Sequence, residues 1–122
     1  MGMGLDNGII VRMHEAEEEE ICYWRKCWGL RDCIIKMLTE NRRRNTDVAQ
    51  KEISIDVDDI INIINIIQQF DDEDYWVEHG DSIWTYEDIK DDLHVQIDNL
   101  MGLLDTLNSP NNIKDVTFYD SY

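Results

Sequence analysis

The segment from Thr85 to Leu107 has the most regular apolar pattern in the chain. Its apolar residues recur every three or four positions, which is the period of an α-helix. At about 100° per residue they fall within an arc of about 80°. They are Ile89, Leu93, Ile97, Leu100, Leu104 and Leu107. Thr85 with Asp88 three positions later resembles a capping box, and Pro110 follows the last apolar residue closely. We therefore predict a helix over 85–107 that buries this arc.

Four acidic residues fall nearly opposite that arc. Their spacing places them within about 40° of one another and roughly 6 to 10 Å apart along the axis, which is comparable with phosphate spacing in a nucleic acid. They are Glu87, Asp91, Asp98 and Asp105. The pattern predicts a stripe of carboxylates that faces solvent. Many soluble acidic proteins carry such a stripe without binding anything, so a purely solvated face remains an alternative interpretation.

The charge is distributed unevenly along the chain. There are 27 acidic and 11 basic residues, a formal net charge of −16. Residues 1–51 hold 9 acidic and 9 basic side chains, whereas residues 52–122 hold 18 acidic and 2 basic ones. Few acids of the second part can therefore be paired internally, and a basic partner would relieve their repulsion. The same field disfavours direct binding to nucleic acid or to an anionic membrane.

The length of 122 residues fits one domain over 1–122, with 52–122 as its acidic part. We find no run of about 18 apolar residues and no basic segment followed by an apolar one at the start. We therefore expect neither a membrane span nor a secretory signal, and a cytoplasmic location. Met1 and Met3 are both candidate starts.

The rest of the chain predicts two further helices and a small sheet. One helix is expected over 21–38, with the Glu17–Glu20 run in its first turn, where the helix dipole favours carboxylates. Another follows Asp56 as N-cap and runs over 57–70, although its isoleucine density leaves a strand open. Strands are expected at 8–11, 52–56 and 116–119, and a small hairpin over 75–84. The predicted fold is α+β, with three helices packed on a small, mostly antiparallel sheet.

Two basic features stand out against the acidic background. Arg31 falls on the apolar arc of the helix expected over 21–38, so it needs a carboxylate partner in the fold. The run Arg42–Arg44 lies in a polar segment, 41–47, that we interpret as a loop. This run could dock on the acidic part of a second copy, which leaves a homodimer open, although such runs are more often solvated.

No pattern of a catalytic or metal site is found. Cys22, Cys27 and Cys33 do not have the spacing of a zinc site or a disulfide framework, and we expect reduced, packed thiols. An EF-hand loop that starts at Asp56 or Asp71 fails at several ligand positions. No nucleophile, phosphate-loop or dinucleotide motif occurs. We predict a protein that is not an enzyme and that has no cofactor and no metal.

Three segments of the chain have distinctive motifs. They are the opening Met3-Gly4-Leu5-Asp6, the run Tyr23-Trp24-Arg25-Lys26 and the aromatic ending Phe118-Tyr119-Asp120-Ser121-Tyr122. These motifs resemble those of a group of small phage and prophage proteins. In that group the Tyr-Trp-Arg-Lys motif begins the first long helix. The resemblance implies an accessory protein of a mobile element in a bacterial host cell.

Together these patterns predict a phage-encoded acidic inhibitor that binds the nucleic-acid groove of a host defence nuclease, such as a CRISPR effector, by nucleic-acid mimicry. The partner is then a basic, nucleic-acid-binding host protein. The alternative is an antitoxin-like interaction module that binds a basic partner without mimicry and uses exposed aromatic residues. The partner-binding residues that we predict are Glu87, Asp91, Asp98 and Asp105, with Asp71, Asp72, Glu73 and Asp74 at the rim, and Tyr75, Trp76 and Trp84 as the aromatic residues.

Overall fold

The computed structural model describes residues 5–42 and 52–121. Within them lie four helices and four strands, so the α+β class is confirmed, while the number of helices is four rather than the predicted three. In chain order the elements are β1 (Asp6–Met13), β2 (Glu18–Arg25), α1 (Trp28–Arg42), β3 (Glu52–Ser54), α2 (Val57–Phe70), α3 (Glu73–His79), α4 (Tyr86–Leu107) and β4 (Ile113–Ser121).

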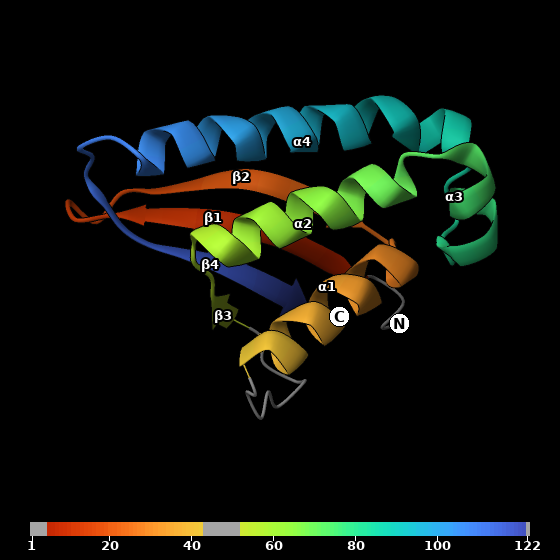
Figure 1. The fold of residues 1–122 in the computed structure, drawn as a ribbon, viewed down its shortest axis with the longest axis horizontal. Helices are drawn as coiled ribbons and strands as arrows, with labels where there is room; N and C mark the ends of the chain where they lie inside the picture. Colours follow the sequence, from red (N-terminus) through yellow and green to blue (C-terminus); the bar gives the residue numbers. More distant parts are fainter. Residues whose placement is uncertain (1–4, 43–51, 122) are drawn as a thin grey trace.

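The four strands form one antiparallel sheet in the order β2-β1-β4-β3. The first and last strands of the chain are neighbours at its centre, with Ile9 opposite Phe118 (Figure 1). The strands predicted at 8–11, 52–56 and 116–119 are all present in this sheet. Strands β1 and β4 are longer than expected, and β3 is shorter. The centre of the sheet is therefore built by a contact between segments far apart in the sequence.

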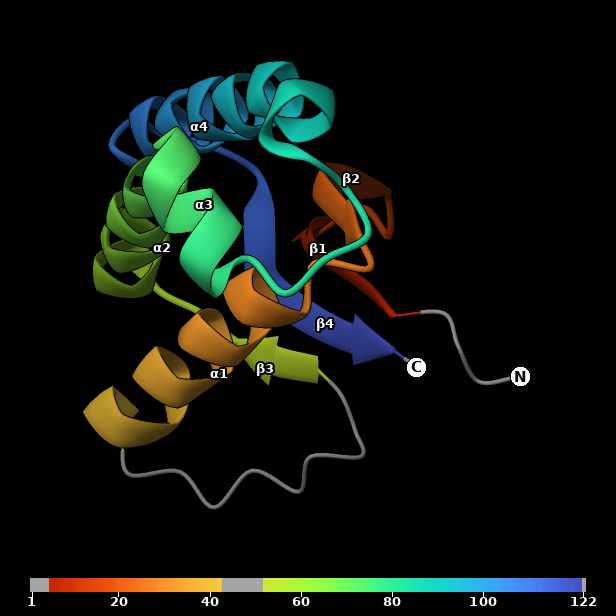
Figure 2. The same cartoon turned by 90° about the vertical axis from the view of Figure 1, so that its right-hand side faces the viewer.

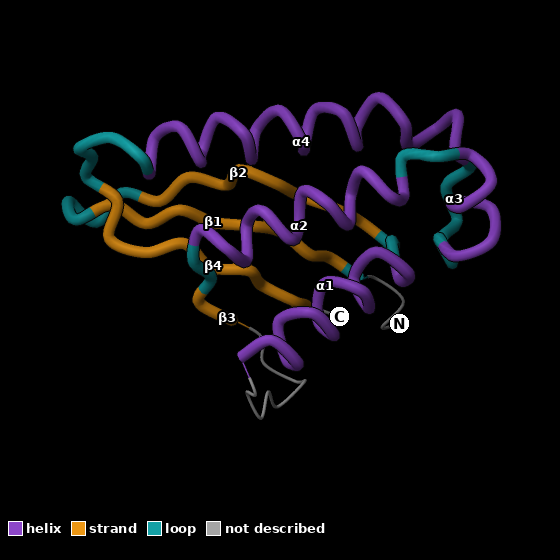
Figure 3. The backbone as a smooth tube through the Cα atoms, viewed as in Figure 1, coloured by secondary structure: helices purple, strands orange, loops and turns teal. Residues whose placement is uncertain are grey.

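The helices α1, α2 and α4 lie together over one face of the sheet, as the end-on view shows (Figure 2). Apolar side chains from alternate strand positions meet the helices there, among them Ile9, Trp24 and Phe118. Ile63 and Leu93, both with no exposed surface, supply the helix side of this core. In the tube view, drawn from the helix side, α2 crosses in front of the strands (Figure 3). The opposite face of the sheet is left without a helix in the described part of the chain.

The helix that we predicted over 21–38 starts later in the structure than expected. Residues 18–25 form strand β2 instead, and α1 starts only at Trp28. A tight turn with Ala16 at a φ of 68° reverses the chain, and Cys22 and Trp24 then pair with Ile9 and Asn7 of β1. This pairing, which local sequence does not reveal, outweighs the helical spacing of the apolar residues. The Tyr23–Lys26 motif therefore lies at the end of a strand and not at the start of a helix.

Helix α2 forms where Asp56 was predicted to cap it. The Asp56 side chain accepts a hydrogen bond from the backbone N–H of Asp59 at 2.9 Å, and the Asp59 side chain accepts one from the N–H of Asp56 at 3.0 Å. Such a reciprocal capping box satisfies two of the free donors of a helix start. Ile60, Ile63 and Ile67 are fully buried on one side of the helix. The strand alternative for 57–70 is therefore wrong.

The hairpin predicted over 75–84 is also wrong. Residues 73–79 form the short helix α3, because Asp72 caps it by accepting a hydrogen bond from the N–H of Tyr75 at 3.0 Å. The Trp76 ring then turns into the core, and its indole N–H donates to the carbonyl oxygen of Trp84 at 2.9 Å. Residues 81–85, between α3 and α4, are irregular apart from one bridge between Ser82 and Cys27.

Helix α4 begins at the predicted cap, where Thr85 and Asp88 exchange side-chain to backbone hydrogen bonds. Four residues of the predicted arc are buried, but Leu104 and Leu107 are only partly so, and Gln96 and Leu103 are buried instead. The difference arises because α4 packs against both α2 and β2, which turns its buried side toward β2.

Among the described residues no helix is long and apolar enough to cross a membrane. The loop predicted over 41–47 is wrong at its start, because Asn41 and Arg42 are the last residues of α1. Residues 43–47, with Arg43 and Arg44, lie outside the described residues.

Candidate partner-binding surface

The four acids of the predicted stripe are all exposed on the outer side of α4. Glu87, Asp91, Asp98 and Asp105 face solvent, while Ile89 and Leu100 on the other side of the helix enter the core. From Glu87 to Asp105 the helix rises by about 27 Å, because each residue adds about 1.5 Å. The stripe therefore runs along most of one edge of the helix layer.

Most of this stripe is not neutralised by the protein itself. Lys90 pairs with Glu87 at 3.1 Å, and this hydrogen bond raises the pKa of Lys90. Within residues 5–42 and 52–121, Asp91, Asp98 and Asp105 have no ion-pair partner. Three carboxylates thus stand side by side along the helix with their charge uncompensated.

Asp71, predicted at the rim, is instead a structural residue. It caps the end of α2, and its carboxylate accepts a hydrogen bond from the Tyr86 hydroxyl at 2.8 Å. The ring Nε2 of His94 lies 2.5 Å from the second carboxylate oxygen. The bond to Asp71 raises the pKa of Tyr86 to about 12. Asp71 therefore joins α2 to α4, and only 17% of its side chain is exposed.

The other three rim residues lie at the start of α3. Asp72 caps the helix, while Glu73 and Asp74 are exposed in its first turn. Glu73 is close enough to Lys90 of α4 to contribute to raising the pKa of that amine. The two segments therefore form one surface, which we call the acidic edge: Glu73, Asp74, Glu87, Asp91, Asp98 and Asp105.

One further carboxylate joins the acidic edge from strand β2. Glu19 stands opposite Val11, which is buried under the helices, and with Asp98 it lines a hollow of about 390 Å³ between β2 and α4. The sequence predicted this glutamate in the first turn of a helix, so its place beside α4 was missed. Only the pairing of β2 with β1 brings it there, and no local pattern signals it.

The three aromatic residues predicted for contact with a partner are largely occupied inside the fold. Trp76 is buried, with 4% of its surface exposed, so its predicted exposure is wrong. Tyr75 and Trp84 are half-buried. The Tyr75 ring packs edge-on against Phe70 at 5.0 Å, and the Trp84 indole donates to the carbonyl oxygen of Arg25 at 2.7 Å. These residues hold the segment 71–85 against the core.

Exposed apolar side chains occur at other positions that sequence reasoning missed. Val77 on α3 and Ile83 in the following loop are 75% and 64% exposed. On α4, Val95 and Met101 are 50% and 53% exposed and flank the acidic edge on its two sides. For Val95 and Met101 the sequence did contain a signal of exposure, because both lie off the apolar arc of α4. The surface therefore combines carboxylates with apolar side chains.

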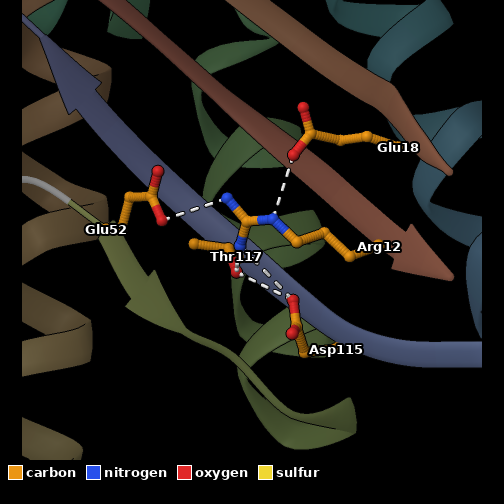
Figure 4. A network of polar contacts seen from close by, with 5 residues as sticks. All are labelled: Arg12, Glu18, Glu52, Asp115 and Thr117. Atoms are coloured by element: carbon orange, nitrogen blue, oxygen red, sulfur yellow. Dashed lines mark hydrogen bonds and ion pairs between the residues drawn. The ribbon is translucent and has the colours of Figure 1, made fainter. Parts of the chain in front are cut away.

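The acids on the open face of the sheet have a different role, because a central arginine neutralises them. Arg12 of β1 contacts Glu18 at 2.9 Å, Glu52 at 3.1 Å and Asp115 at 3.5 Å, and also donates to the Thr117 hydroxyl (Figure 4). The hydrogen bonds to Glu18 and Glu52 raise the pKa of Arg12. One basic side chain thus ties together all four strands, whereas α4 has no equivalent.

The described residues do not form a metal or thiol centre. No group of three His, Cys, Asp or Glu side chains among them is arranged to hold a metal ion. Cys22 and Cys27 are buried, and burial raises the pKa of both thiols, that of Cys27 to about 12. The most distinctive chemical feature of the described surface is therefore the uncompensated charge of the acidic edge.

No protein-family model, no curated protein and no solved structure matches this chain.

Proposed function

We propose that this protein is a non-enzymatic inhibitor, phage-encoded, that occupies the nucleic-acid-binding groove of a host defence nuclease such as a CRISPR effector. The proposal rests on one observation above all. Asp91, Asp98 and Asp105 are exposed in a row on one rigid helix without an ion-pair partner in the described part of the chain. The resemblance of the chain to phage and prophage proteins makes a defence nuclease the natural target.

The charge of the acidic edge favours a basic partner on energetic grounds. Like charges on one helix face repel each other, and the chain carries that cost when it is alone. A groove lined with Lys and Arg removes the repulsion and releases the counterions that both surfaces hold in solution. The stripe is also straight and has a spacing close to that of phosphates, so the same basic side chains can pair with it.

The two-layer fold supports such a role because the acidic edge is built on elements with fixed positions. Helix α4 is anchored by its capping box at Thr85, by the hydrogen bonds of Tyr86 and His94 to Asp71, and by the bond from Asn99 to the carbonyl oxygen of Ile21 at 3.0 Å. A rigid row of charges loses little conformational entropy when it binds. Long-range attraction would also make association fast and sensitive to salt.

The test begins with capture of the partner and continues with the purified pair. The tagged protein is expressed in a bacterium, and proteins that co-purify at low and moderate salt are identified. Binding of the purified partner is then measured with DNA or RNA as competitor. We expect a nucleic-acid-binding protein that nucleic acid displaces. Replacing Asp91, Asp98 and Asp105 with Asn should weaken binding by at least about tenfold, since several charge pairs of roughly 1 kcal/mol are lost.

A matched control separates the acidic edge from total charge. Glu15, Glu40 and Asp58 are exposed, and none of the three belongs to α3 or α4. Replacing them with Gln, Gln and Asn removes the same formal charge and should leave affinity within about twofold. The proposal fails if both triple variants weaken binding equally, or if the partner binds nucleic acid and this protein at the same time.

A second function is favoured by the exposed apolar residues near the acidic edge. With Val77 and Ile83 exposed by 75% and 64%, the protein could bind a basic partner through a mixed apolar surface, as an antitoxin does, without mimicry. In that case Val77→Ser with Ile83→Ser would abolish binding, while the triple Asn variant would reduce it only slightly. Nucleic acid would then not compete.

A further inference from the structure

The hollow between β2 and α4 differs in chemistry from the rest of the acidic edge. Its floor is apolar and includes Val11, Met13, Ile21 and Leu103. Two acidic residues, Glu19 and Asp98, face the same hollow. With a volume of about 390 Å³ it falls within the size range of small-ligand sites. The acids and the apolar residues therefore line one open hollow between β2 and α4.

A β-bulge in the β1–β2 pair creates this arrangement. The pairing runs from Ile9 opposite Cys22 directly to Ile10 opposite Glu20, so Ile21 is an extra residue. Past the bulge, Glu19 stands opposite Val11, whose side chain is buried under the helices. Glu19 therefore faces α4 instead of the open side of the sheet.

Helix α4 completes the hollow with a residue that has no side chain. A Cβ added at Gly102 would meet nothing within 4 Å, so the helix leaves space where most residues would fill it. Gly in a helix interior costs roughly 1 kcal/mol relative to Ala. Asn99, one turn before, fixes the helix to the bulge by donating to the carbonyl oxygen of Ile21.

Glu19 and Asp98 have no internal partner in the described segments, whereas Glu20 accepts a hydrogen bond from the Tyr119 hydroxyl at 2.6 Å. An occupant of the hollow must therefore bring an apolar stem for the floor and a positive charge for the two unpaired carboxylates. An arginine side chain has both, and its planar guanidinium, which is weakly hydrated, can serve two carboxylates at once.

We propose that the hollow between β2 and α4 receives an arginine side chain of the protein partner. This inference rests on the proposed function in one respect, since the arginine belongs to the basic partner proposed above. The arginine anchors the partner at Asp98, within the acidic edge. Asp91 then pairs with a more exposed cation of the partner farther along α4.

The direct test uses a small probe and does not need the partner. The full chain, labelled with ¹⁵N, is titrated with Nα-acetyl-arginine amide and followed by NMR. We expect saturable shifts at Val11, Leu103 and Gly102. The citrulline derivative, which has the same shape without the charge, should give none. Gly102→Leu fills the space without changing the charge and should weaken probe binding by at least about tenfold, while Gly102→Ala, with only one added methyl, should weaken it far less.

Three results would overturn the inference: equal shifts for the lysine derivative, shifts spread evenly over all exposed acids, or unchanged binding in Gly102→Leu. Because leucine is a better helix former than glycine, a folding failure is not expected, and the amide spectrum of the variant verifies it. The outcome is separable from that of the proposed function. If Gly102→Leu leaves partner affinity intact while the triple Asn variant abolishes it, the hollow is not used but groove binding stands.

Discussion

The guanidinium of Arg31 on α1 forms a hydrogen-bonded ion pair with the carboxylate of Asp120 near the end of β4. Nη2 of the arginine lies 2.6 Å from Oδ2, and Nε donates to both carboxylate oxygens at 3.2 Å. Asn7 adds a further bond to Oδ1 at 2.6 Å. Only 3% of the Asp120 side chain and 14% of the Arg31 side chain are exposed. This pair, with Asn7, therefore links helix α1, strand β1 and strand β4 at a largely buried site.

Replacing Asp120 with Asn should destabilise the protein by roughly 2–4 kcal/mol, because it leaves the Arg31 charge buried beside a neutral group. Arg31 also pairs with Asp32, but that carboxylate is 64% exposed. Asp32→Asn should therefore cost less than about 1 kcal/mol. Urea unfolding of the two variants measures both values. Equal losses would mean that burial does not set the strength of the pair.

The sequence predicts the need for this partner but not its identity. Arg31 falls on the apolar arc of its helix, so a carboxylate had to be near it. Asp120 lies 89 positions away in the chain, and only the sheet topology brings it there. Local patterns likewise identified α2 and α4, because capping residues and apolar spacing lie within each segment.

The wrong sequence-based predictions also arise from contacts between residues that are distant in the chain. Strand β2 was taken for a helix because its apolar residues fit both periods, and the choice is made by pairing with β1. The predicted stripe on α4 is exposed as expected, but Asp71 is bonded to Tyr86 and His94, and Glu19 was missed. Solvent exposure of one helix face follows from periodicity, whereas contacts between distant segments do not.

Two glycines should respond in opposite directions to alanine. The N–H of Gly29 donates to the carbonyl oxygen of Gly80, and an added Cβ would lie 2.7 Å from that oxygen and closer still to the carbonyl oxygen of His79. Gly29→Ala should therefore cost about 1–3 kcal/mol. Gly102→Ala meets no atom and should stabilise α4 by roughly 1 kcal/mol. Thermal unfolding followed by circular dichroism measures both. A destabilising Gly102→Ala would show that the space at 102 is not open.

The three thiols should react in a fixed order. Cys33 is partly exposed, whereas Cys22 and Cys27 are buried, and burial raises the pKa of all three. Because the thiolate is the reactive form, native protein should react with iodoacetamide first at Cys33, and at the other two at least about a hundredfold more slowly. Mass spectrometry of timed samples gives the order, and urea-unfolded protein is the control. Early labelling of Cys27 would contradict the contact between the 26–27 segment and Ser82.

Asp92 should make stability depend on pH. Burial beside β2 raises the pKa of its carboxyl, although the hydrogen bond from Gln96 lowers it in part. The folded state therefore holds this proton more tightly than the unfolded state, and stability falls as pH rises from about 3.9 through the folded pKa. Asp92→Asn removes that loss. We expect it to be more stable than the parent at about pH 7 and equal to it below about pH 3.5. The exposed neighbour change Asp91→Asn controls for net charge, and an equal effect there would refute the role of burial.

The uncompensated charge of the acidic edge should make the isolated protein more stable in salt. Its carboxylates stand roughly 6 to 10 Å apart, which is within the Debye length of about 10 Å at 0.1 M salt. Raising NaCl from about 0.02 M to about 0.3 M should thus add on the order of 1 kcal/mol to the free energy of unfolding. Replacing Asp91, Asp98 and Asp105 with Asn should raise stability at low salt and flatten its salt dependence. Urea unfolding at both salt concentrations measures this, with the Glu15, Glu40 and Asp58 variant as control. If both triple variants keep the salt dependence of the parent, the repulsion that we assign to the acidic edge is absent, and with it the energetic reason for a basic partner.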